Sequence, residues 1–385
     1  MSGEDEPTSS AASTTASRVI VLGASAGGVE ALKTVVAGLP ANFPAAVLIV
    51  LHMAPSSPSI LPRLLQGRCA LPVDFAADGE PLVAGRVYVA SPDRHLVVER
   101  GRVRVTRAPR ENHSRPAIDP LFRSAALAYG ARAVGVILSG RLDDGTAGLW
   151  AVKDRGGVAI VQDPADALHA DMPRNALQYT TADHVLRADA IAPLLVRLVT
   201  GPAEAAPPLP DRPPPRELEL EVRIAMEDSA LRQGVMTLGP VSPYTCPECH
   251  GVLVRVQEGG VPRFRCHTGH AYSIDSLLAS LTETVEATLW NALRAVEESV
   301  MLLHEAAARA RGADTGLGAR DDARLVGARL EEKAREAETR AEAIRQAVLR
   351  HQALSLASVR AAAGATGAAR DAAARDDDDP DAAHG

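Results

Sequence analysis

Cysteine is scarce in this sequence, with four residues among 385. So few cysteines cannot build the disulfide framework of a small secreted domain. Cys69 stands alone and is expected to be an inert core thiol. The other three, Cys246, Cys249 and Cys266, fall in one short segment with the spacing of metal ligands, so this segment is a candidate metal site.

Long apolar runs and an excess of basic residues are also missing. No stretch of about 18 uninterrupted apolar residues occurs, and residues 1–17 lack the basic and apolar regions of a secretion signal. With a formal net charge of −7, the chain has no overall basic field to attract nucleic acid. These absences predict a cytoplasmic protein that neither inserts into a membrane nor binds nucleic acid.

Apolar runs alternate with helical patterns over residues 18–200, which predicts an α/β domain. The runs are apolar on both faces, as in the strands of a doubly wound, mostly parallel sheet that helices cover on both sides. The expected buried strands are residues 19–22, 46–51, 87–90, 134–138 and 158–161. An antiparallel hairpin of residues 95–98 and 103–106 is expected to decorate this sheet.

Proline marks the end of this domain. Seven prolines between Pro202 and Pro215 predict a semi-rigid linker over residues 201–217. Such a linker can hold the C-terminal half at a distance, which is the favoured arrangement, although it could also fold back. Residues 217–226 fit either a strand or a helix. The remaining expected parts are a disordered N-terminus over 1–17, a zinc ribbon over 240–275, an α-helical hairpin over 276–352 and a disordered acidic tail over 360–385.

Ser25 is the candidate nucleophile. The first strand runs into a turn of small residues, 23–28 (GASAGG), and then into a helical pattern, so the turn exposes Ser25 and the helix directs N–H groups towards it. Such a turn can instead be a phosphate-binding loop or a plain tight turn. A Rossmann loop would have glycine in place of Ser25, and a P-loop would end in Gly-Lys-Ser or Gly-Lys-Thr. The pattern favours a catalytic serine.

His52 ends the second strand, at the edge where the carboxyl ends of parallel strands converge, and it is the favoured general base. Residues 23–27 also match the G-x-S-x-G turn of α/β-hydrolases, in which the acid precedes the histidine. In that rival arrangement His169 would be the base. A histidine after an apolar strand can also be structural.

A carboxylate from a third strand end should orient the imidazole and stabilise its charged form. Asp144 follows the strand at 134–138 and precedes Gly145, which starts another helical pattern. Asp143 is the neighbouring alternative. Either aspartate could instead be a helix N-cap.

Taken together, these motifs resemble the catalytic domain of the chemotaxis protein-glutamate methylesterase family over residues 17–199. The matching segments, in chain order, are 23–28 (GASAGG, similar to GASTGG), 52–53 (HM, similar to QHM), 115–126 (RPAIDPLFRSAA, similar to RPSVDxLFxSAA), 139–148 (SGRLDDGTAG, similar to TGMGxDGxxG), 162–163 (QD) and 172–174 (MPR). The resemblance selects Asp144 over Asp143, because the family's aspartate directly precedes glycine. It likewise selects His52 over His169.

The resemblance implies a serine hydrolase that removes methyl esters from glutamate side chains of chemoreceptors and releases methanol. In some members the same site deamidates receptor glutamine. It implies a triad of Ser25, His52 and Asp144, no cofactor for catalysis, and a methylated chemoreceptor as partner.

The sequence departs from the family pattern in three respects. Leu51 replaces the glutamine before the histidine. Arg141-Leu142 replaces a Met-Gly pair whose backbone helps to bind the oxyanion, and loss of the glycine can alter the loop. Typical members carry an N-terminal phospho-receiver domain, which the 17 residues before the first strand cannot form, so a catalytic domain without a receiver is expected.

Cys246 and Cys249, followed after sixteen residues by Cys266, predict a Cys₃His zinc ribbon. The candidate fourth ligands are His250, His267 and His270. His270 is favoured, because Gly269 eases the turn and because similar C-terminal segments of such esterases carry this Gly-His pair. Four protein ligands would make the zinc structural. Reduced cysteines without a metal are the alternative.

Arginine is concentrated between Asp93 and Arg115, where seven arginines accompany three acidic residues. This segment is either a solvated hairpin face or a docking surface for an acidic receptor helix. Three functions remain in competition: a chemosensory protein methylesterase, a small-molecule ester or amide hydrolase, and a catalytically silent chemosensory scaffold. The order of the motifs favours the first.

Overall fold

The computed structural model describes residues 16–56, 58, 60–200, 212–227, 229–312 and 317–351. The chain divides into two units, residues 1–277 and 278–385. The first unit contains the three sheets of the described residues, and the second contains a pair of long helices. Among the described residues, no helix combines the length and apolarity needed to cross a bilayer.

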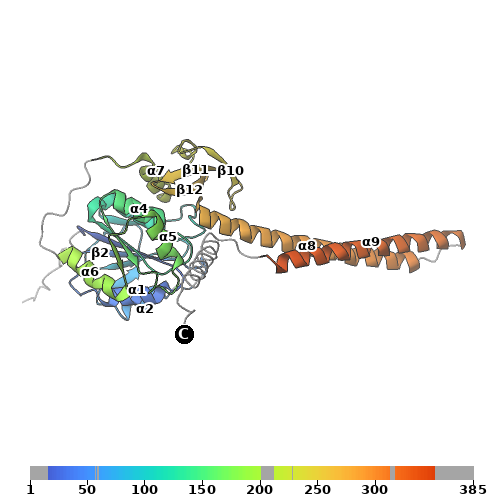
Figure 1. The fold of residues 1–385 in the computed structure, drawn as a ribbon, viewed down its shortest axis with the longest axis horizontal. Helices are drawn as coiled ribbons and strands as arrows, with labels where there is room; N and C mark the ends of the chain where they lie inside the picture. The colour runs from blue at the N-terminus through green and yellow to red at the C-terminus, as the bar shows by residue number, and fades with distance from the viewer. Residues whose placement is uncertain are drawn as a thin grey trace, which may run out of the picture. The chain divides into compact units, whose positions relative to one another are not determined.

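A seven-stranded sheet lies at the centre of the first unit (Figure 1). Its order is β3-β4-β2-β1-β7-β8-β9, and every neighbouring pair is parallel. The strands are β1 (Val19–Ala24), β2 (Ala46–Leu51), β3 (Val73–Phe75), β4 (Val87–Val89), β7 (Ala133–Ile137), β8 (Val158–Gln162) and β9 (His184–Leu186). The predicted α/β class is confirmed.

Helices cover both faces of this sheet. They are α1 (Gly28–Ala37), α2 (Leu61–Gln66), α3 (Ile118–Tyr129), α4 (Thr146–Asp154), α5 (Asp171–Tyr179) and α6 (Ala188–Thr200). Val19 and Val21 of β1 belong to the core that includes α3 and α4, whereas Ile20 and Leu22 belong to the core that includes α1 and α6. Because successive strand residues face opposite sides, both kinds of position must be apolar, and the strand reads as one continuous run.

Smaller elements complete this part of the chain. The predicted hairpin is present as β5 (His95–Glu99) and β6 (Arg102–Thr106), which pair antiparallel. A short 3₁₀ turn, η1 (Gly130–Arg132), joins α3 to β7.

Residues 217–226, whose pattern fitted a strand or a helix, lie almost entirely in the helix α7 (Arg216–Ala225). Leu218 and Val222 pack in the core shared with α3, whereas Leu220 and Ile224 pack with the segment around Val235. A helix buried on two sides places apolar residues at alternate positions, and this spacing imitates a strand. The turn η2 (Val235–Thr237) follows α7.

A second, antiparallel sheet has the order β10-β11-β12-β13. Its strands are β10 (Val241–Thr245), β11 (Val252–Glu258), β12 (Val261–Cys266) and β13 (Ala271–Ser273). We refer to residues 241–273 as the ribbon.

The ribbon and α7 pack against α3 through a buried ion cluster, which consists of Glu111, Asp119, Arg123, Glu221, Glu258, Arg263 and Arg265. Arg123 of α3 is fully buried and lies 3.2 Å from Glu221 of α7 and 3.3 Å from Glu258 of β11. Arg265 of β12 lies 2.7 Å from Glu111. The favoured expectation of a ribbon held at a distance is therefore wrong, and the alternative of a chain that folds back holds for the ribbon.

The second unit confirms the predicted helical hairpin. Its elements are α8 (Ile274–Gly312), which begins in the first unit, and α9 (Leu317–Leu349). His304 of α8 contacts Glu331 of α9 at 3.1 Å, and Arg311 contacts the same glutamate at 2.9 Å. The predicted disordered ends lie outside the described residues, apart from Ala16 and Ser17, and Ala16 is buried. Most of the predicted linker, residues 201–211, also lies outside them.

Candidate active site and metal centre

Ser25 lies in the turn between β1 and α1, at the carboxyl edge of the parallel sheet. Its N–H donates to Ser139 O at 3.0 Å, and its carbonyl accepts the N–H of Gly28 at 2.9 Å. Gly27 has a φ of 73°, and a Cβ added there would lie 2.8 Å from the Ser139 hydroxyl. The small residues around Ser25 therefore permit a tight turn that packs against the loop after β7.

His52 follows β2, the strand next to β1. Its backbone N–H donates to Ala24 O at 3.1 Å, which places His52 beside Ser25 at the same sheet edge. The imidazole Nε2 lies 2.6 Å from Asp144 Oδ2. No hydrogen bond joins the Ser25 hydroxyl to this ring among the described contacts, and such catalytic bonds are often long before a substrate binds.

Asp144 is buried and anchored at both carboxylate oxygens. Oδ2 accepts from His52 and from the N–H of Ile118, each at 2.6 Å. Oδ1 accepts from Asn112 Nδ2 at 2.9 Å and from the N–H of Asp119 at 3.3 Å. Burial opposes ionisation, but these hydrogen bonds and the histidine hold the pKa of Asp144 below its ordinary value. An ionised Asp144 accepts a hydrogen bond from Nε2–H of His52. Nδ1 of the same ring then keeps a free lone pair, as a general base requires.

Asp143 points elsewhere. Its carboxyl lies 2.6 Å from the Ser273 hydroxyl, and burial raises its pKa to about 8. Neither aspartate caps α4, because the N-cap is Gly145 and the side chain that bonds to the first turn is that of Asp119, which accepts the N–H of Gly148 at 2.7 Å. His169 lies near Ser139 and Gly140 through its backbone, with hydrogen bonds of 2.9 and 3.0 Å.

The loop that departs from the family pattern keeps a conformation suited to glycine. Leu142 has a φ of 60°, in the left-handed region that residues other than glycine adopt at a cost of about 1–2 kcal/mol. Its carbonyl accepts from Asn175 Nδ2 at 3.0 Å, a contact that holds this backbone. Leu51, the other substitution, is buried.

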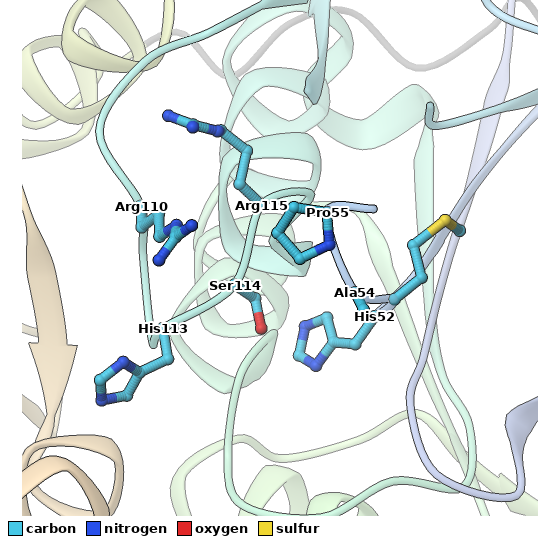
Figure 2. A pocket seen from close by; sticks show the side chains of 8 residues that line it. His52, Ala54, Pro55, Arg110, His113, Ser114 and Arg115 are labelled. Atoms are coloured by element: carbon cyan, nitrogen blue, oxygen red, sulfur yellow. The ribbon is translucent and has the colours of Figure 1, made fainter. Parts of the chain in front are cut away.

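An open pocket of about 360 Å³ lies beside His52 (Figure 2). Residues 52–55 form one wall, and Arg110, His113, Ser114 and Arg115 form the other. Ser25 is not among the lining residues. Arg115 is paired with Asp93 at 2.6 Å, whereas Arg110 has no carboxylate within ion-pair distance among the described residues. The pocket therefore offers an uncompensated positive charge to an acidic ligand.

Asn112 also contacts the candidate site, and the sequence did not predict it. It lies in the loop before α3, three residues before the start of the quoted 115–126 motif, and it is buried against Asp144. Its φ of 48° is a conformation that asparagine tolerates better than most residues. An asparagine in a charged loop just before a recognised motif is a weak signal, and the sequence carries no stronger one.

The structure brings together Cys246, Cys249, Cys266 and His270, whose potential ligand atoms lie within 4.8 Å of one another. Cys249 Sγ and Cys266 Sγ are 3.6 Å apart, and His270 Nδ1 is 3.6 Å from both Cys246 Sγ and Cys266 Sγ. A tetrahedral ion with Zn–S bonds of about 2.3 Å needs sulfur separations of about 3.8 Å, so the cluster can hold a metal ion. His270 Nε2 lies 3.2 Å from Glu248, which would fix Nδ1 as the ligand atom.

Comparisons with known proteins point to one family. Residues 20–195 match the profile of the CheB methylesterase family. A Leptospira interrogans protein named putative protein-glutamate methylesterase/protein-glutamine glutaminase is 41% identical over 180 residues, which are 46% of this chain and 93% of that protein. An Anaeromyxobacter dehalogenans protein-glutamate methylesterase/protein-glutamine glutaminase is 43% identical over 196 residues, 50% of this chain and 54% of that protein. The crystal structure of the Thermotoga maritima CheB methylesterase catalytic domain is 35% identical, covers 47% of this chain and 98% of that chain, and has a TM-score of 0.46.

Proposed function

We propose that this chain, which belongs to the CheB methylesterase family, hydrolyses glutamate methyl esters on chemoreceptor-type proteins with Ser25, His52 and Asp144 as its catalytic triad. The observation that carries the proposal is the 2.6 Å contact between His52 and a buried, ionised Asp144, beside a serine on the adjacent strand end. The same acyl transfer with ammonia as leaving group would deamidate glutamine, as the names of the relatives state for those proteins.

In the proposed reaction Ser25 Oγ attacks the ester carbonyl while His52 Nδ1 takes its proton. The N-terminus of α1, which begins at Gly28, faces the developing oxyanion with its N–H groups. His52 then returns the proton to the departing methanol, and a water activated by the same nitrogen cleaves the acyl-enzyme. Asp144 stays ionised throughout and stabilises the imidazolium.

The pocket supports an acidic protein substrate. Arg110 has no ion-pair partner among the described residues, so a carboxylate of the receptor could pair with it without displacing a carboxylate of this chain. The proposed substrate is an acidic receptor segment, in which unmethylated glutamates surround the methylated one. The arginines between Asp93 and Arg115 would attract such a segment. A chemoreceptor substrate places the proposed reaction in the cytoplasm.

The metal cluster supports a structural zinc ion. Three thiolates and an imidazole are the donors that zinc prefers, and four protein ligands leave no open position for a substrate. The proposed ion would stabilise the ribbon and take no part in ester hydrolysis.

The decisive experiment is methanol release from methylated receptor by wild type and Ser25→Ala. The variant is expected to fold and to lose at least about 10⁴-fold in turnover, because the acyl-enzyme route disappears. Ser299→Ala, at an exposed serine on α8, is the control and should keep wild-type turnover. Near wild-type turnover of Ser25→Ala would refute the triad.

A further inference from the structure

The loop before α3 is held by the ribbon. Ala271 of β13 donates its N–H to Arg110 O at 3.2 Å and accepts the N–H of Asn112 at 2.9 Å, forming a parallel bridge at Glu111. Asn112 and His113 have φ values of 48° and 65°, in the left-handed region. Two successive residues of this kind persist where surrounding structure holds them, and here β13 supplies that structure. The ribbon thus shapes the loop that forms one wall of the pocket.

The side chain of Asn112 connects the α/β domain to the end of the ribbon and the start of α8. Its Nδ2 donates to Asp144 at 2.9 Å and to Asp119 at 3.3 Å. Its Oδ1 accepts the N–H of Ser273 and the hydroxyl of Ser276, both at 2.9 Å. The amide orientation is determined, because the NH₂ group meets carboxylates and the oxygen meets donors. All three linking residues, Asn112, Ser273 and Ser276, are buried.

Asp144 depends on this amide at one of its two oxygens. The other donor to Oδ1 is the N–H of Asp119, at 3.3 Å, a weaker contact than the 2.9 Å bond from Asn112. Without Asn112, the carboxylate would be anchored mainly at Oδ2 and could rotate together with His52. A displacement of about 1 Å in a catalytic group can cost about 100-fold in rate.

We propose that Asn112 is a positioning residue for the His52–Asp144 pair and that Ser273 and Ser276 hold it in place, which makes the ribbon part of the active-site framework. The inference rests on the proposed function in taking Ser25 as the nucleophile that this pair serves. The C-terminal part of the chain then acts on the rate of the chemical step itself.

The first test measures kcat and KM of the full chain for ester hydrolysis, with a thermal melt for each variant. Asn112→Ala is expected to lower kcat by about 100-fold and Ser276→Ala by about tenfold, with KM within about twofold of wild type. Ser242→Ala is the control, because this buried ribbon serine accepts from Tyr244 N–H within β10. The proposal is overturned if Asn112→Ala folds and keeps the wild-type kcat, whether KM is unchanged or raised. It is also overturned by a Ser276→Ala effect no larger than that of Ser242→Ala.

The second test is a pH profile of Asn112→Asp. The charged groups around this position are Asp144 and Asp119, with Arg123 behind Asp119 and Asp143 beyond Ser273. The carboxyl group that this substitution introduces can donate to Asp144 while it is protonated, as the amide does, whereas its ionised form repels Asp144. The kcat of this variant relative to wild type is therefore expected to fall as the pH rises. A constant ratio at every pH would indicate a merely structural role and overturn the proposal.

Labelling of Ser25 by a fluorophosphonate separates this inference from the proposed substrate, since labelling needs the triad and no receptor. If wild type labels at Ser25 but releases no methanol from methylated receptor, the substrate is wrong. A slower labelling rate in Ser276→Ala than in Ser242→Ala then still supports the positioning role, and equal rates overturn it. If wild type neither labels nor releases methanol, both the triad and the positioning role fail.

Discussion

Asp143 and Asp144 show how burial and hydrogen-bond partners assign different roles to identical neighbours. Asp144 is buried among donors and stays ionised, whereas Asp143 is buried against a hydroxyl and its pKa is raised to about 8. At neutral pH most Asp143 side chains are therefore protonated and neutral. The charge that orients His52 comes from Asp144 alone.

The paired amide variants test this assignment. Asp144→Asn is expected to lower kcat by about 10⁴-fold, because a neutral amide favours the wrong tautomer of His52 and cannot stabilise its charged form. Asp143→Asn is expected to stay within about threefold of wild type, because an amide oxygen can accept from Ser273 as the protonated acid does. Both rates are measured on the same methylated receptor. Similar, mild losses in the two variants would contradict the role of Asp144.

At the scale of elements, the ribbon packs on the α/β domain in two places. One is the buried ion cluster, and the other is the turn between β11 and β12. Gly259 in that turn has a φ of 59°, and a Cβ there would lie 2.1 Å from Cε2 of Trp150 in α4. The neighbouring Gly260 would place a Cβ within 4 Å of no atom. Gly259 therefore combines a left-handed backbone with a close approach to Trp150, whereas Gly260 has neither.

Gly259→Ala is expected to lower the free energy of unfolding by at least about 2 kcal/mol, from the strained backbone and from the clash with Trp150. Gly260→Ala is the control and should change it by less than about 1 kcal/mol. Denaturant titration of both variants measures the difference. An equal effect of the two substitutions would argue against contact between this turn and α4.

At the scale of the whole molecule, the buried ion cluster links the ribbon to α3. Three arginines meet four carboxylates, so the cluster is closest to neutral when it holds one proton. Burial, with nearby carboxylates, raises the pKa of Asp119 to about 7 and that of Glu258 to about 8, while Arg123 and Arg265 overcome burial to hold the pKa of Glu111 at about 2. Removing one side of a buried charge pair typically costs about 3–5 kcal/mol, so loss of the ribbon should destabilise α3.

Cys246→Ser is expected to lose the proposed zinc ion and to increase hydrogen exchange in α3 as well as in the ribbon. Metal binding contributes on the order of 10 kcal/mol to the folding of such ribbons, and an unfolded ribbon would leave Arg123 without Glu258. Metal analysis and hydrogen exchange measure the two effects. Cys69→Ser, the same change at a buried cysteine outside the metal cluster, should retain one zinc per chain. Metal loss with unchanged exchange in α3 would contradict the coupling.

The sequence by itself determined the features that depend on short stretches of chain. The alternation of strands and helices, the turn around Ser25, and the spacing of Cys246, Cys249 and Cys266 are local patterns, and they predicted the parallel sheet and the groups that could form each site. The motif order singled out His52 and Asp144, and the 2.6 Å contact between them agrees with that selection without testing their roles.

Tertiary structure alone decided how the C-terminal part joins the candidate active site. Asn112 meets Ser273 and Ser276 across 161 and 164 residues of chain, and Arg265 meets Glu111 across 154. A single sequence carries no periodicity that relates positions so far apart, because these contacts depend on how finished elements pack. The same packing made α7 apolar on two sides and so concealed its helical period. A proline-rich stretch predicts an extended linker. Whether the parts that it joins stay apart depends on the charged residues on either side, because charges that become buried must find partners.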